Sequence, residues 1–453
     1  MYLFTHRKDL RITDLRAFDY IIRNHKDPGL HLLILDPALT TKERLTAHSG
    51  RSFLTHAAQL IAQYADAGQT LHLLYGQPAD ITAALLGAYP AIDEVIVHAD
   101  YTPYARQRDE QLQQATRHAG RKWLPLADAP LADLEEFHTF ARRSEPYKVF
   151  TPFHRMWSTY MQQHYAPAGR TTVRDLHTVG SLDSGVAARF ALPPAIAAAL
   201  AEGAERAAAG AAPEAQGELS RFVRERLSAY GERRDDYAAA GTSGLARFLN
   251  AGAISAREAY ESAQGSYGAD TWIRQLAWRD FYLYQAMFHE NFFRYEHLVD
   301  QSPLSDRHFE AWATAQTGVP IIDAAMTQLL QTGELPNRLR MVTAMFLTKN
   351  LLCPFTLGEQ HFRLHLSDYD NTLNRGGWLW SSSLGYDAAP YFRIMNPVTQ
   401  SQTHNPSGDY IRRWLPELAH QSDRDIHLPE PHAIVDVKAS RARAIEVYKT
   451  ILA

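Results

Sequence analysis

Short runs of apolar residues recur along the first third of the chain, and segments with helical spacing separate them. The runs stand at residues 2–5, 30–35, 71–75, 95–98 and 122–126. Between two of them, over residues 51–67, apolar side chains repeat every third or fourth position, which is typical of an amphipathic helix. Buried strands that alternate with helices predict a doubly wound α/β domain with a parallel sheet, and we place it at residues 1–129.

The pattern changes twice beyond this domain. The alternation stops over residues 130–182, where we expect an ordered connecting segment that includes residues 149–153. Residues 185–217 are alanine-rich, and this composition favours a helix or a loosely tethered segment. From residue 218 onward helical spacing prevails, with breaks at Gly or Pro. The sequence therefore predicts a connecting segment over 130–217 and a larger all-α domain over 218–453.

Composition supports a globular chain and narrows its chemistry. Of 453 residues, 45% are hydrophobic and 21% charged, so large cores can form. A single cysteine, Cys353, excludes an internal disulfide and a centre with four thiolate ligands. No apolar run is long enough to span a membrane, and the first residues lack the charge order of a signal peptide, so we expect a soluble cytoplasmic protein.

The formal net charge of −4 neither indicates nor excludes a nucleic-acid partner, because only the surface that contacts the nucleic acid has to be basic. Arginines do gather at 338–340, 375, 393 and 412–413. No GxGxxG follows the first strand, no GxxxxGK[ST] occurs, and no GxSxG elbow is present. The first domain therefore has no nucleotide fingerprint, and the chain has no nucleophile elbow.

The stretch richest in candidate chemistry lies near the end of the chain. Arg340 and Asp368 can form an ion pair there, because a buried charge needs an opposite partner. The Gly-Gly step at 376–377 lets the backbone approach a flat ligand, and Trp378 and Trp380 offer ring faces. These features predict a pocket for a planar polar cofactor, with a second planar group nearby.

Two further patterns have competing explanations. Residues 241–245 precede an apparent helix, so their hydroxyls and backbone N–H groups suit a phosphate, although a helix cap is the commoner role. His361 and His365 have metal-ligand spacing, but Phe362 stands where an HExxH motif needs Glu, and a structural role is favoured. We therefore expect no metal.

The segment 272–284, WIRQLAWRDFYLY, carries polar and aromatic side chains on neighbouring helical turns. Aromatic residues at this spacing usually belong to a core. An Arg and a Gln beside the Trp favour instead a mixed stacking and hydrogen-bonding surface of the kind that grips an extruded base. The residues concerned are Gln275, Trp278, Arg279 and Tyr282.

Taken in order, these motifs resemble the photolyase and cryptochrome family over nearly the full length of the chain. The segments that carry the resemblance are FTHRKDLRITD (4–14), DYTPYARQRD (100–109), FTPF (150–153), TSGLARFL (242–249), WRDFY (278–282) and the nearly continuous run from NRLRM through GGWLW to DAAPYFRIMNP.

The resemblance implies a noncovalent FAD in the helical domain and light-driven repair of DNA. Excited reduced flavin would donate an electron to a cyclobutane pyrimidine dimer flipped out of DNA, the ring would split, and the electron would return. The alternative is a cryptochrome-like blue-light signalling photoreceptor without repair activity. The expected partner is DNA that contains pyrimidine dimers, the expected state is a monomer, and an antenna would be a folate or a deazaflavin near residues 100–109, or absent.

The resemblance also assigns residues. Flavin contacts would come from Tyr230, Thr242, Ser243, Gly244, Leu245, Ala246, Trp272, Gln275, Asn337, Arg340, Asp368, Tyr369, Asp370 and Asn374. The catalytic and lesion-contacting set would be Gln275, Trp278, Asn337, Met341, Asn374 and Trp380. DNA would be bound by Arg234, Gln275, Trp278, Arg279, Tyr282, Asn337, Arg338, Arg393 and Gln400.

The chain departs from the family pattern at three places. Gln275 stands where photolyases commonly have Glu, so it can hydrogen-bond a dimer but cannot protonate it. Trp378 keeps the first position of the usual three-tryptophan electron path, but Phe355 and Ser302 occupy the others, so photoreduction needs another route. Asn337 and the preceding proline replace the paired histidines of (6-4) photolyases, which argues against (6-4) repair.

Overall fold

The computed structural model describes residues 1–209 and 214–452, which group into two compact units. The first unit comprises Met1–Arg142, Trp157–Glu225 and Gly244–Ser266, and the second comprises Arg143–Met156, Arg226–Ser243 and Tyr267–Ala453. Each unit is therefore assembled from distant segments. The boundaries 1–129, 130–217 and 218–453 stay predictions, and residues 210–213 of the alanine-rich segment lie outside the described residues.

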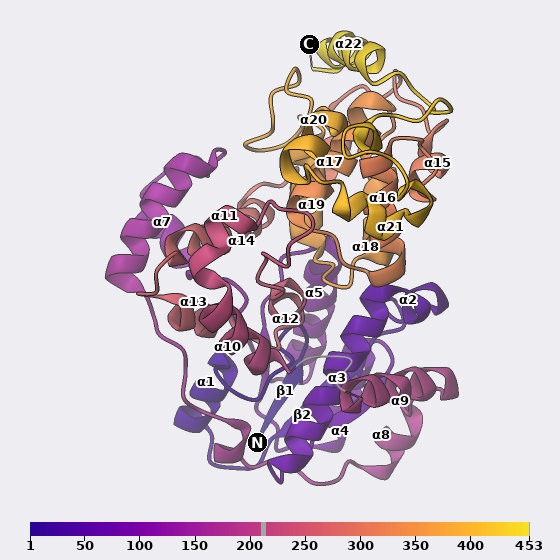
Figure 1. The fold of residues 1–453 in the computed structure, drawn as a ribbon. Coiled ribbons are helices and arrows are strands. Elements are labelled where there is room, and N and C mark those ends of the chain that lie inside the picture. The colour runs from indigo at the N-terminus through magenta and orange to yellow at the C-terminus, as the bar shows by residue number, and fades with distance from the viewer. Residues whose placement is uncertain (210–213, 453) are drawn as a thin grey trace. The chain divides into compact units, whose positions relative to one another are not determined.

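The first unit contains a five-stranded parallel sheet in the order β3-β2-β1-β4-β5, which confirms the predicted α/β fold (Figure 1). Leu3 on the central strand pairs with Leu30 on one side and with Val95 on the other. The strands are β1 (Tyr2–His6), β2 (Leu30–Leu35), β3 (His72–Tyr75), β4 (Glu94–His98) and β5 (Lys122–Leu126).

Helices cover both faces of this sheet. Tyr2 and Phe4 of β1 pack in one hydrophobic cluster with residues of α1 and α3, whereas Leu3 packs in another with residues of α4 and α8. Successive strand residues point to opposite faces, so the two clusters lie on the two sides of the sheet. The helices of the unit are α1 (Arg16–Asn24), α2 (Lys42–Thr46), α3 (His48–Asp66), α4 (Pro78–Ala88), α5 (Pro103–His118), α6 (Leu134–Phe140), α8 (Ser184–Arg189), α9 (Pro194–Ala208), α10 (Ala215–Glu225), α12 (Ala246–Ala251) and α13 (Ala256–Ala263), with a short 3₁₀ turn η1 (Val173–Asp175).

The alanine-rich segment forms helices where it is described, as its composition favours. Helix α9 packs on α3 so closely that a Cβ on Gly203 would stand 2.8 Å from the Leu54 carbonyl oxygen. A side chain at this position would therefore force the two helices apart.

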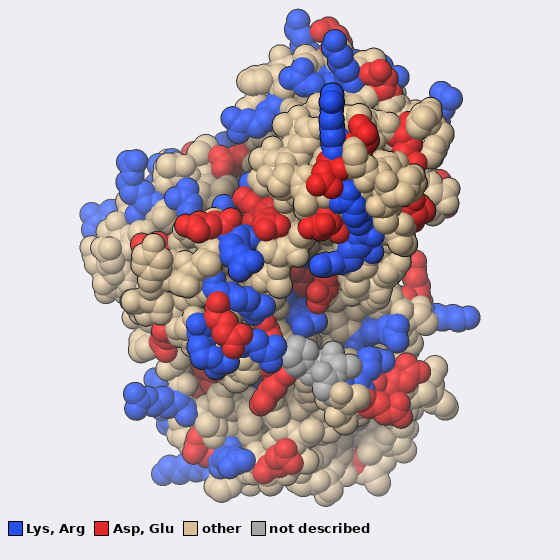
Figure 2. Space-filling model, viewed as in Figure 1, with Lys and Arg blue, Asp and Glu red and all other residues tan. Residues whose placement is uncertain are grey.

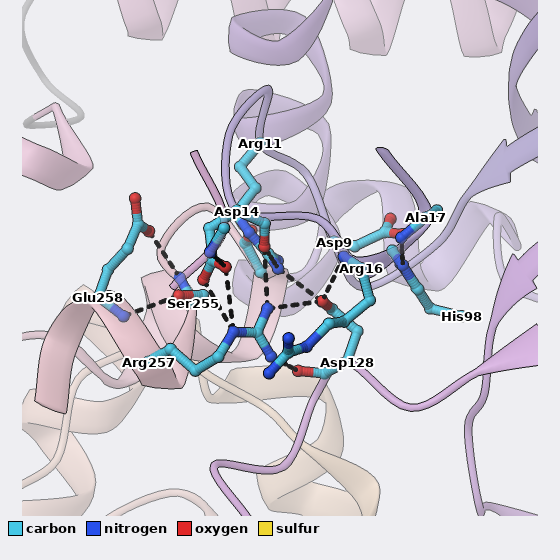
Figure 3. Close-up of polar contacts among 12 residues, drawn as sticks. Asp9, Arg11, Asp14, Arg16, Ala17, His98, Asp128, Ser255, Arg257 and Glu258 are labelled. Carbon is cyan, nitrogen blue, oxygen red and sulfur yellow. Dashed lines mark hydrogen bonds and ion pairs between the residues drawn. The ribbon is translucent and has the colours of Figure 1, made fainter. Parts of the chain in front are cut away.

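A buried ion network ties α13 to the sheet portion of the first unit (Figure 3). The Arg257 guanidinium binds the Asp14 carboxylate at 3.0 Å and the Asp128 carboxylate at 2.8 Å. Asp128 also accepts from Arg11 at 2.6 Å. All four side chains are at least 95% buried, so each charge depends on the others for compensation.

The regular elements of the second unit are all helices within its described residues, and one of them, α14, contains the predicted helix over 272–284. Helix α7 (Phe150–His164) begins in this unit and ends in the first. Residues 150–153 of the segment 149–153, which was expected as connection, therefore start a helix. The remaining elements are η2 (Leu227–Ala229), α11 (Tyr230–Arg233), α14 (Ala269–Phe288), η3 (Phe292–Leu298), α15 (Phe309–Ala313), α16 (Pro320–Thr332), α17 (Asn337–Met345), the π-helix η4 (Phe346–Asn350), α18 (Phe355–His365), α19 (Asn371–Ser381), α20 (Pro397–His404), α21 (Asp409–Trp414), η5 (Pro416–Leu418), η6 (Asp425–His427) and α22 (Val437–Ile451).

Within the described residues, none of the helices combines the length and the apolarity that a bilayer crossing requires. On the face that Figure 2 shows, Lys and Arg side chains are interspersed with Asp and Glu.

Candidate functional site

The predicted ion pair between Arg340 and Asp368 is present in the second unit. Arg340, on α17, donates to the Asp368 carboxylate at 2.8 Å and to the Leu335 carbonyl at 2.7 Å. The carboxylate lies in the turn between α18 and α19, so the pair joins α17 to the start of α19. Both side chains keep some exposure, which leaves the pair able to contact a ligand.

Asp370 and Asn374 are fixed at the first turn of α19. Asp370 is the N-cap residue, and its carboxylate accepts from the Leu373 N–H at 3.0 Å, which satisfies a backbone donor that the helix cannot. The Asn374 amide nitrogen donates to the Glu359 carbonyl at 3.1 Å. Because the nitrogen is committed to α18, the amide oxygen of Asn374 remains as an acceptor for a ring N–H.

Trp378 is held among rings. It is only 2% exposed, its centroid lies 5.0 Å from Phe362 and 6.1 Å from Trp312, and a Cβ on Gly358 would stand 2.1 Å from its ring. Its indole N–H has no hydrogen-bond partner among the described residues. A buried donor left in this way is suited to an acceptor that the chain itself does not supply.

Neither of the other two positions of the usual electron path offers a tryptophan. Phe355 is buried, and the Arg375 guanidinium lies 4.9 Å from its ring centroid. Ser302 is exposed and donates to the Asp300 carboxylate. The tryptophan that does contact Trp378 is Trp312, which is completely buried and donates to the Thr343 carbonyl at 3.1 Å. Sequence reasoning missed Trp312, because only the fold brings α15 beside α18 and α19.

The Gly-Gly step has two different surroundings, which corrects one expectation. Gly376 faces the Tyr282 ring, which a Cβ would meet at 2.2 Å, so this glycine admits an aromatic side chain of α14 and not a ligand. Gly377 is exposed, and a Cβ there would meet nothing within 4 Å. Only Gly377 leaves open space beside α19.

Helix α14 brings the expected lesion-contacting residues to one side. Gln275 donates to the Thr271 carbonyl at 3.2 Å, one turn earlier. Trp278 is half-buried, and its ring stacks on Phe150 with 3.6 Å between centroids and 7° between planes. Tyr282 lies 5.8 Å from Trp278, and burial raises the Tyr282 pKa. The role of Phe150 was not recognised from the sequence.

The start of α17 presents a second set. Asn337 is exposed, and its amide nitrogen donates to the Met341 sulfur at 3.5 Å, so these two predicted residues are adjacent. Arg338 donates to Asp235 at 2.6 Å and to Gln400 at 3.4 Å. Burial acts to raise the pKa of Asp235, but the hydrogen bond and charge of Arg338, together with the charges of Arg234 and His404, outweigh it and lower the pKa.

Other predicted residues are dispersed over the second unit. Tyr230 and Trp272 are buried, and Arg234 lies 5.9 Å from the Tyr230 ring centroid. The Tyr369 hydroxyl donates to the Asn371 amide oxygen at 3.0 Å. The remaining positions differ in exposure: Arg279 and Trp380 are half-buried, and Arg393 is exposed.

The predicted loop over 242–246 is divided between the units. Thr242 is exposed and Ser243 half-buried in the second unit, whereas Gly244, Leu245 and Ala246 belong to the first. Helix α12 begins at Ala246 with Leu245 as its N-cap and no side-chain capping bond. The expectation of a Thr-Ser cap was therefore wrong, because the helix starts later than the hydroxyls.

His361 and His365 pack as aromatic rings, with centroids 4.3 Å apart. Trp312 lies 5.4 Å from His361, and burial lowers the His361 pKa to about 3. The neutral ring is held in an aromatic cluster, and the described residues contain no group of three or more potential metal ligands. This arrangement matches the structural role that the sequence favoured.

The polar groups around α19 fit a planar, polar cofactor. The Asn374 amide oxygen can accept a hydrogen bond, the buried Trp378 indole N–H has no partner among the described residues, and a Cβ on Gly377 would meet nothing within 4 Å. The ion pair of Arg340 and Asp368 lies just before the start of the same helix, α19. A flavin ring has matching donors and acceptors on its polar edge.

Two family models of known proteins together match most of the chain. Residues 272–450 match the family model described as the FAD binding domain of DNA photolyase, and residues 2–170 match the model described as DNA photolyase. Proteins named deoxyribodipyrimidine photo-lyase are similar along nearly the whole chain. The one from Vibrio cholerae is 33% identical and covers 99% of both chains, and the one from Alkalihalophilus pseudofirmus is 32% identical and covers 98% of this chain and 96% of its own.

Solved structures show the same fold. The class III photolyase from Agrobacterium tumefaciens superposes with a TM-score of 0.81 at 27% identity, covering 100% of this chain and 97% of its own. The cryptochrome of Synechocystis has a TM-score of 0.80 at 22% identity, with 99% of each chain covered. The second likeness concerns the fold alone.

Proposed function

The chain belongs to the photolyase and cryptochrome family, and from that premise we propose that it is a light-driven lyase that splits cyclobutane pyrimidine dimers in DNA. The observation that carries the proposal is the half-buried Trp278 ring on α14, one turn beyond Gln275. A flat apolar ring beside an amide suits an extruded base pair, which presents flat faces and a hydrogen-bonding edge. Relatives named deoxyribodipyrimidine photo-lyase support the same reading.

FAD is the cofactor of this family, and when bound in its reduced form it would supply, under light, the electron that opens the dimer ring. In the second unit we assign its binding to the residues around α19 together with Tyr230 and Trp272. Asn374 would offer its amide oxygen to the bound cofactor, because its amide nitrogen already donates to the Glu359 carbonyl. Arg340 and Asp368 form an ion pair, so this pair would present no net charge to an anionic cofactor.

The remaining side chains would hold the lesion. Trp278 and Trp380 provide stacking surfaces, Gln275 and Asn337 provide hydrogen bonds to the base edges, and Met341 adds an apolar contact next to Asn337. An amide donates and accepts without changing charge, so Gln275 and Asn337 can bind pyrimidine edges but transfer no proton. We therefore assign the ring opening to electron transfer alone.

We assign the DNA contacts to the charged and polar residues near the side chains that would hold the lesion. Arg338 is oriented by Asp235 and Gln400, and the exposed Arg393 has a free approach to phosphate. The monomeric state, the cytoplasmic location and the nature of any antenna stay predictions.

The test is loss of cyclobutane dimers from ultraviolet-treated duplex DNA, with the flavin of the purified protein chemically reduced beforehand. Prior reduction removes the interrupted electron path from the assay. We expect repair in the light and none in the dark. Absence of repair under both conditions, with reduced FAD bound, would refute the lyase and leave a cryptochrome-like photoreceptor.

A further inference from the structure

Phe150 covers one face of the proposed base-stacking residue. The Phe150 and Trp278 rings are nearly parallel, at 7°, and their centroids are 3.6 Å apart. Phe150 is 1% exposed, whereas Trp278 is half-buried. The pair therefore has a buried member and a member that reaches toward solvent.

Several contacts hold Phe150 in place. It is the first residue of α7, and its backbone N–H is bonded to the Asp387 carboxylate in the segment after α19. The ring meets the edge of Phe281 at 5.7 Å and 81°. The Arg274 guanidinium, one turn before Trp278, lies 5.2 Å from the Phe150 ring centroid. Phe150 is thus anchored through both its backbone and its ring.

An indole ring has two faces on which a base can stack, and here the chain itself occupies one of them. The stacking on Phe150 also restrains rotation of the Trp278 ring, because rotation would break a parallel contact of van der Waals length. A platform that is fixed beforehand loses less side-chain entropy when a ligand stacks on it. This smaller loss of entropy favours only a base that has left the duplex, because a base that is still stacked within the duplex cannot reach the Trp278 ring.

We propose that Phe150 is a positioning residue that fixes Trp278 as a one-sided platform and thereby sets the preference for dimer-containing over intact DNA. The inference rests on the proposed function, because it assumes that Trp278 contacts an extruded dimer. Arg338, one of the residues assigned to DNA, is held by Asp235 and Gln400, whereas Arg274, which lies against the Phe150 ring, is not among the assigned DNA contacts. The effect of Phe150 is therefore confined to the part of the affinity that depends on the lesion.

The experiment measures binding by fluorescence anisotropy, in the dark, to an oligonucleotide with one thymine dimer and to the same sequence without it. Phe150→Leu keeps an apolar side chain but removes the ring, and we expect it to reduce the affinity ratio of the two oligonucleotides about tenfold, within the range for base–aromatic stacking. Phe150→Tyr keeps the ring and should retain the ratio. Phe309→Leu, a change of the same type in a half-buried ring that contacts Trp312, is the matched control and should leave the ratio unchanged.

Coupling to Trp278 separates positioning from general packing. In a Trp278→Ala background, Phe150→Leu should cause no further loss of the ratio, because the platform is already absent. Additive losses, or an unchanged ratio in a folded Phe150→Leu protein, would overturn the inference while leaving the lyase intact. If Phe150→Leu fails to fold, loss of the ratio in Phe150→Tyr would overturn it. A wild-type protein without any preference for the dimer would overturn the proposed function itself.

Discussion

Lys349 is a buried lysine that forms no ion pair with a carboxylate among the described residues. Its ammonium group lies in the π-helix η4, donates to the Ser383 hydroxyl at 2.8 Å and to the Ser382 carbonyl at 3.3 Å, and lies 3.1 Å from the Tyr448 ring centroid. Burial lowers its pKa to about 6. The side chain joins α22 to the segment that follows Trp378 and Trp380, at the cost of holding an amine away from water.

Lys349 should therefore make the protein more stable as the pH rises. The unfolded chain binds a proton up to a pKa near 10.4 and the folded chain only up to about 6, so the free energy of unfolding increases between these values. Urea unfolding at pH 6.5 and pH 9 should show that Lys349→Met removes roughly 2–3 kcal/mol of this increase. The control Lys438→Met, at an exposed lysine of α22, should remove none of this increase. The same increase in the free energy of unfolding from pH 6.5 to pH 9 in both variants would contradict the assignment to Lys349.

The residues around Trp378 predict slow photoreduction of the flavin. Phe355 is a poor electron relay and stands beside the Arg375 cation, which disfavours a positive charge on its ring. Trp312 contacts Trp378 but is completely buried, so this pair does not lead to solvent.

We expect light-driven flavin reduction without added reductant to be slow in the wild-type protein and faster in a Phe355→Trp, Ser302→Trp double variant. The measurement is the absorbance of oxidised flavin under blue light. The single variant Phe355→Trp is the control, since it leaves the exposed end of the path without a ring. Fast reduction in the wild type would show that another route operates.

Helix α13 is held in place by a buried charge, Arg257, as well as by its buried alanines. Arg257 lies between the Asp14 and Asp128 carboxylates, and Arg11 shares Asp128. Burial acts to raise the pKa of Asp128, but the neighbouring cations hold it well below its usual value. The element thus depends on an ion network that spans three segments of the first unit.

Removal of the central cation should destabilise the protein strongly. Arg257→Met leaves the Asp14 and Asp128 carboxylates buried with less compensation, and we expect a loss of about 3–5 kcal/mol in the free energy of unfolding. Guanidinium unfolding measures it. Arg224→Met, at an exposed pair with Glu225 in the same unit, should cost less than about 1 kcal/mol. A similar small loss for Arg257→Met would show that water compensates the two carboxylates.

Across the whole chain, histidines with a pKa lowered by burial make the fold sensitive to acid, and they lie in both units, His361 in the second and His31 and His56 in the first. Burial holds His31 neutral with a strongly lowered pKa, and it lowers the pKa of His56 to about 4. Unfolding lets both rings bind a proton below pH 6.5, so their contribution to stability is complete above that pH and falls as the pH drops toward 4. The lowered carboxyl pKa values of Asp9 and Asp128 act at still lower pH.

We expect the free energy of unfolding to fall between pH 6.5 and 4.5, and His56→Leu to reduce that fall by roughly 2 kcal/mol. His118→Leu, at an exposed position of α5, is the control and should leave the fall unchanged. The measurement is denaturant unfolding at several pH values. A fall of the same size in His56→Leu would assign the sensitivity to other groups.

The sequence by itself determined the element types and the chemical inventory. Strand and helix periods are local, so the five strands and helix α14 could be predicted from spacing alone. The Arg340 and Asp368 pair could also be predicted, because a charge within a largely apolar stretch requires a partner. The motifs, taken in order, identified the family.

Only the tertiary structure decided which distant residues meet. The strand order, the Phe150 ring on Trp278, the Tyr282 ring on Gly376 and the Arg257 network all join segments that are far apart in the chain. No local period records such contacts, because they depend on how complete elements pack. The residues that the sequence missed are therefore the ones that position the predicted site, and their neighbours exist only in the folded chain.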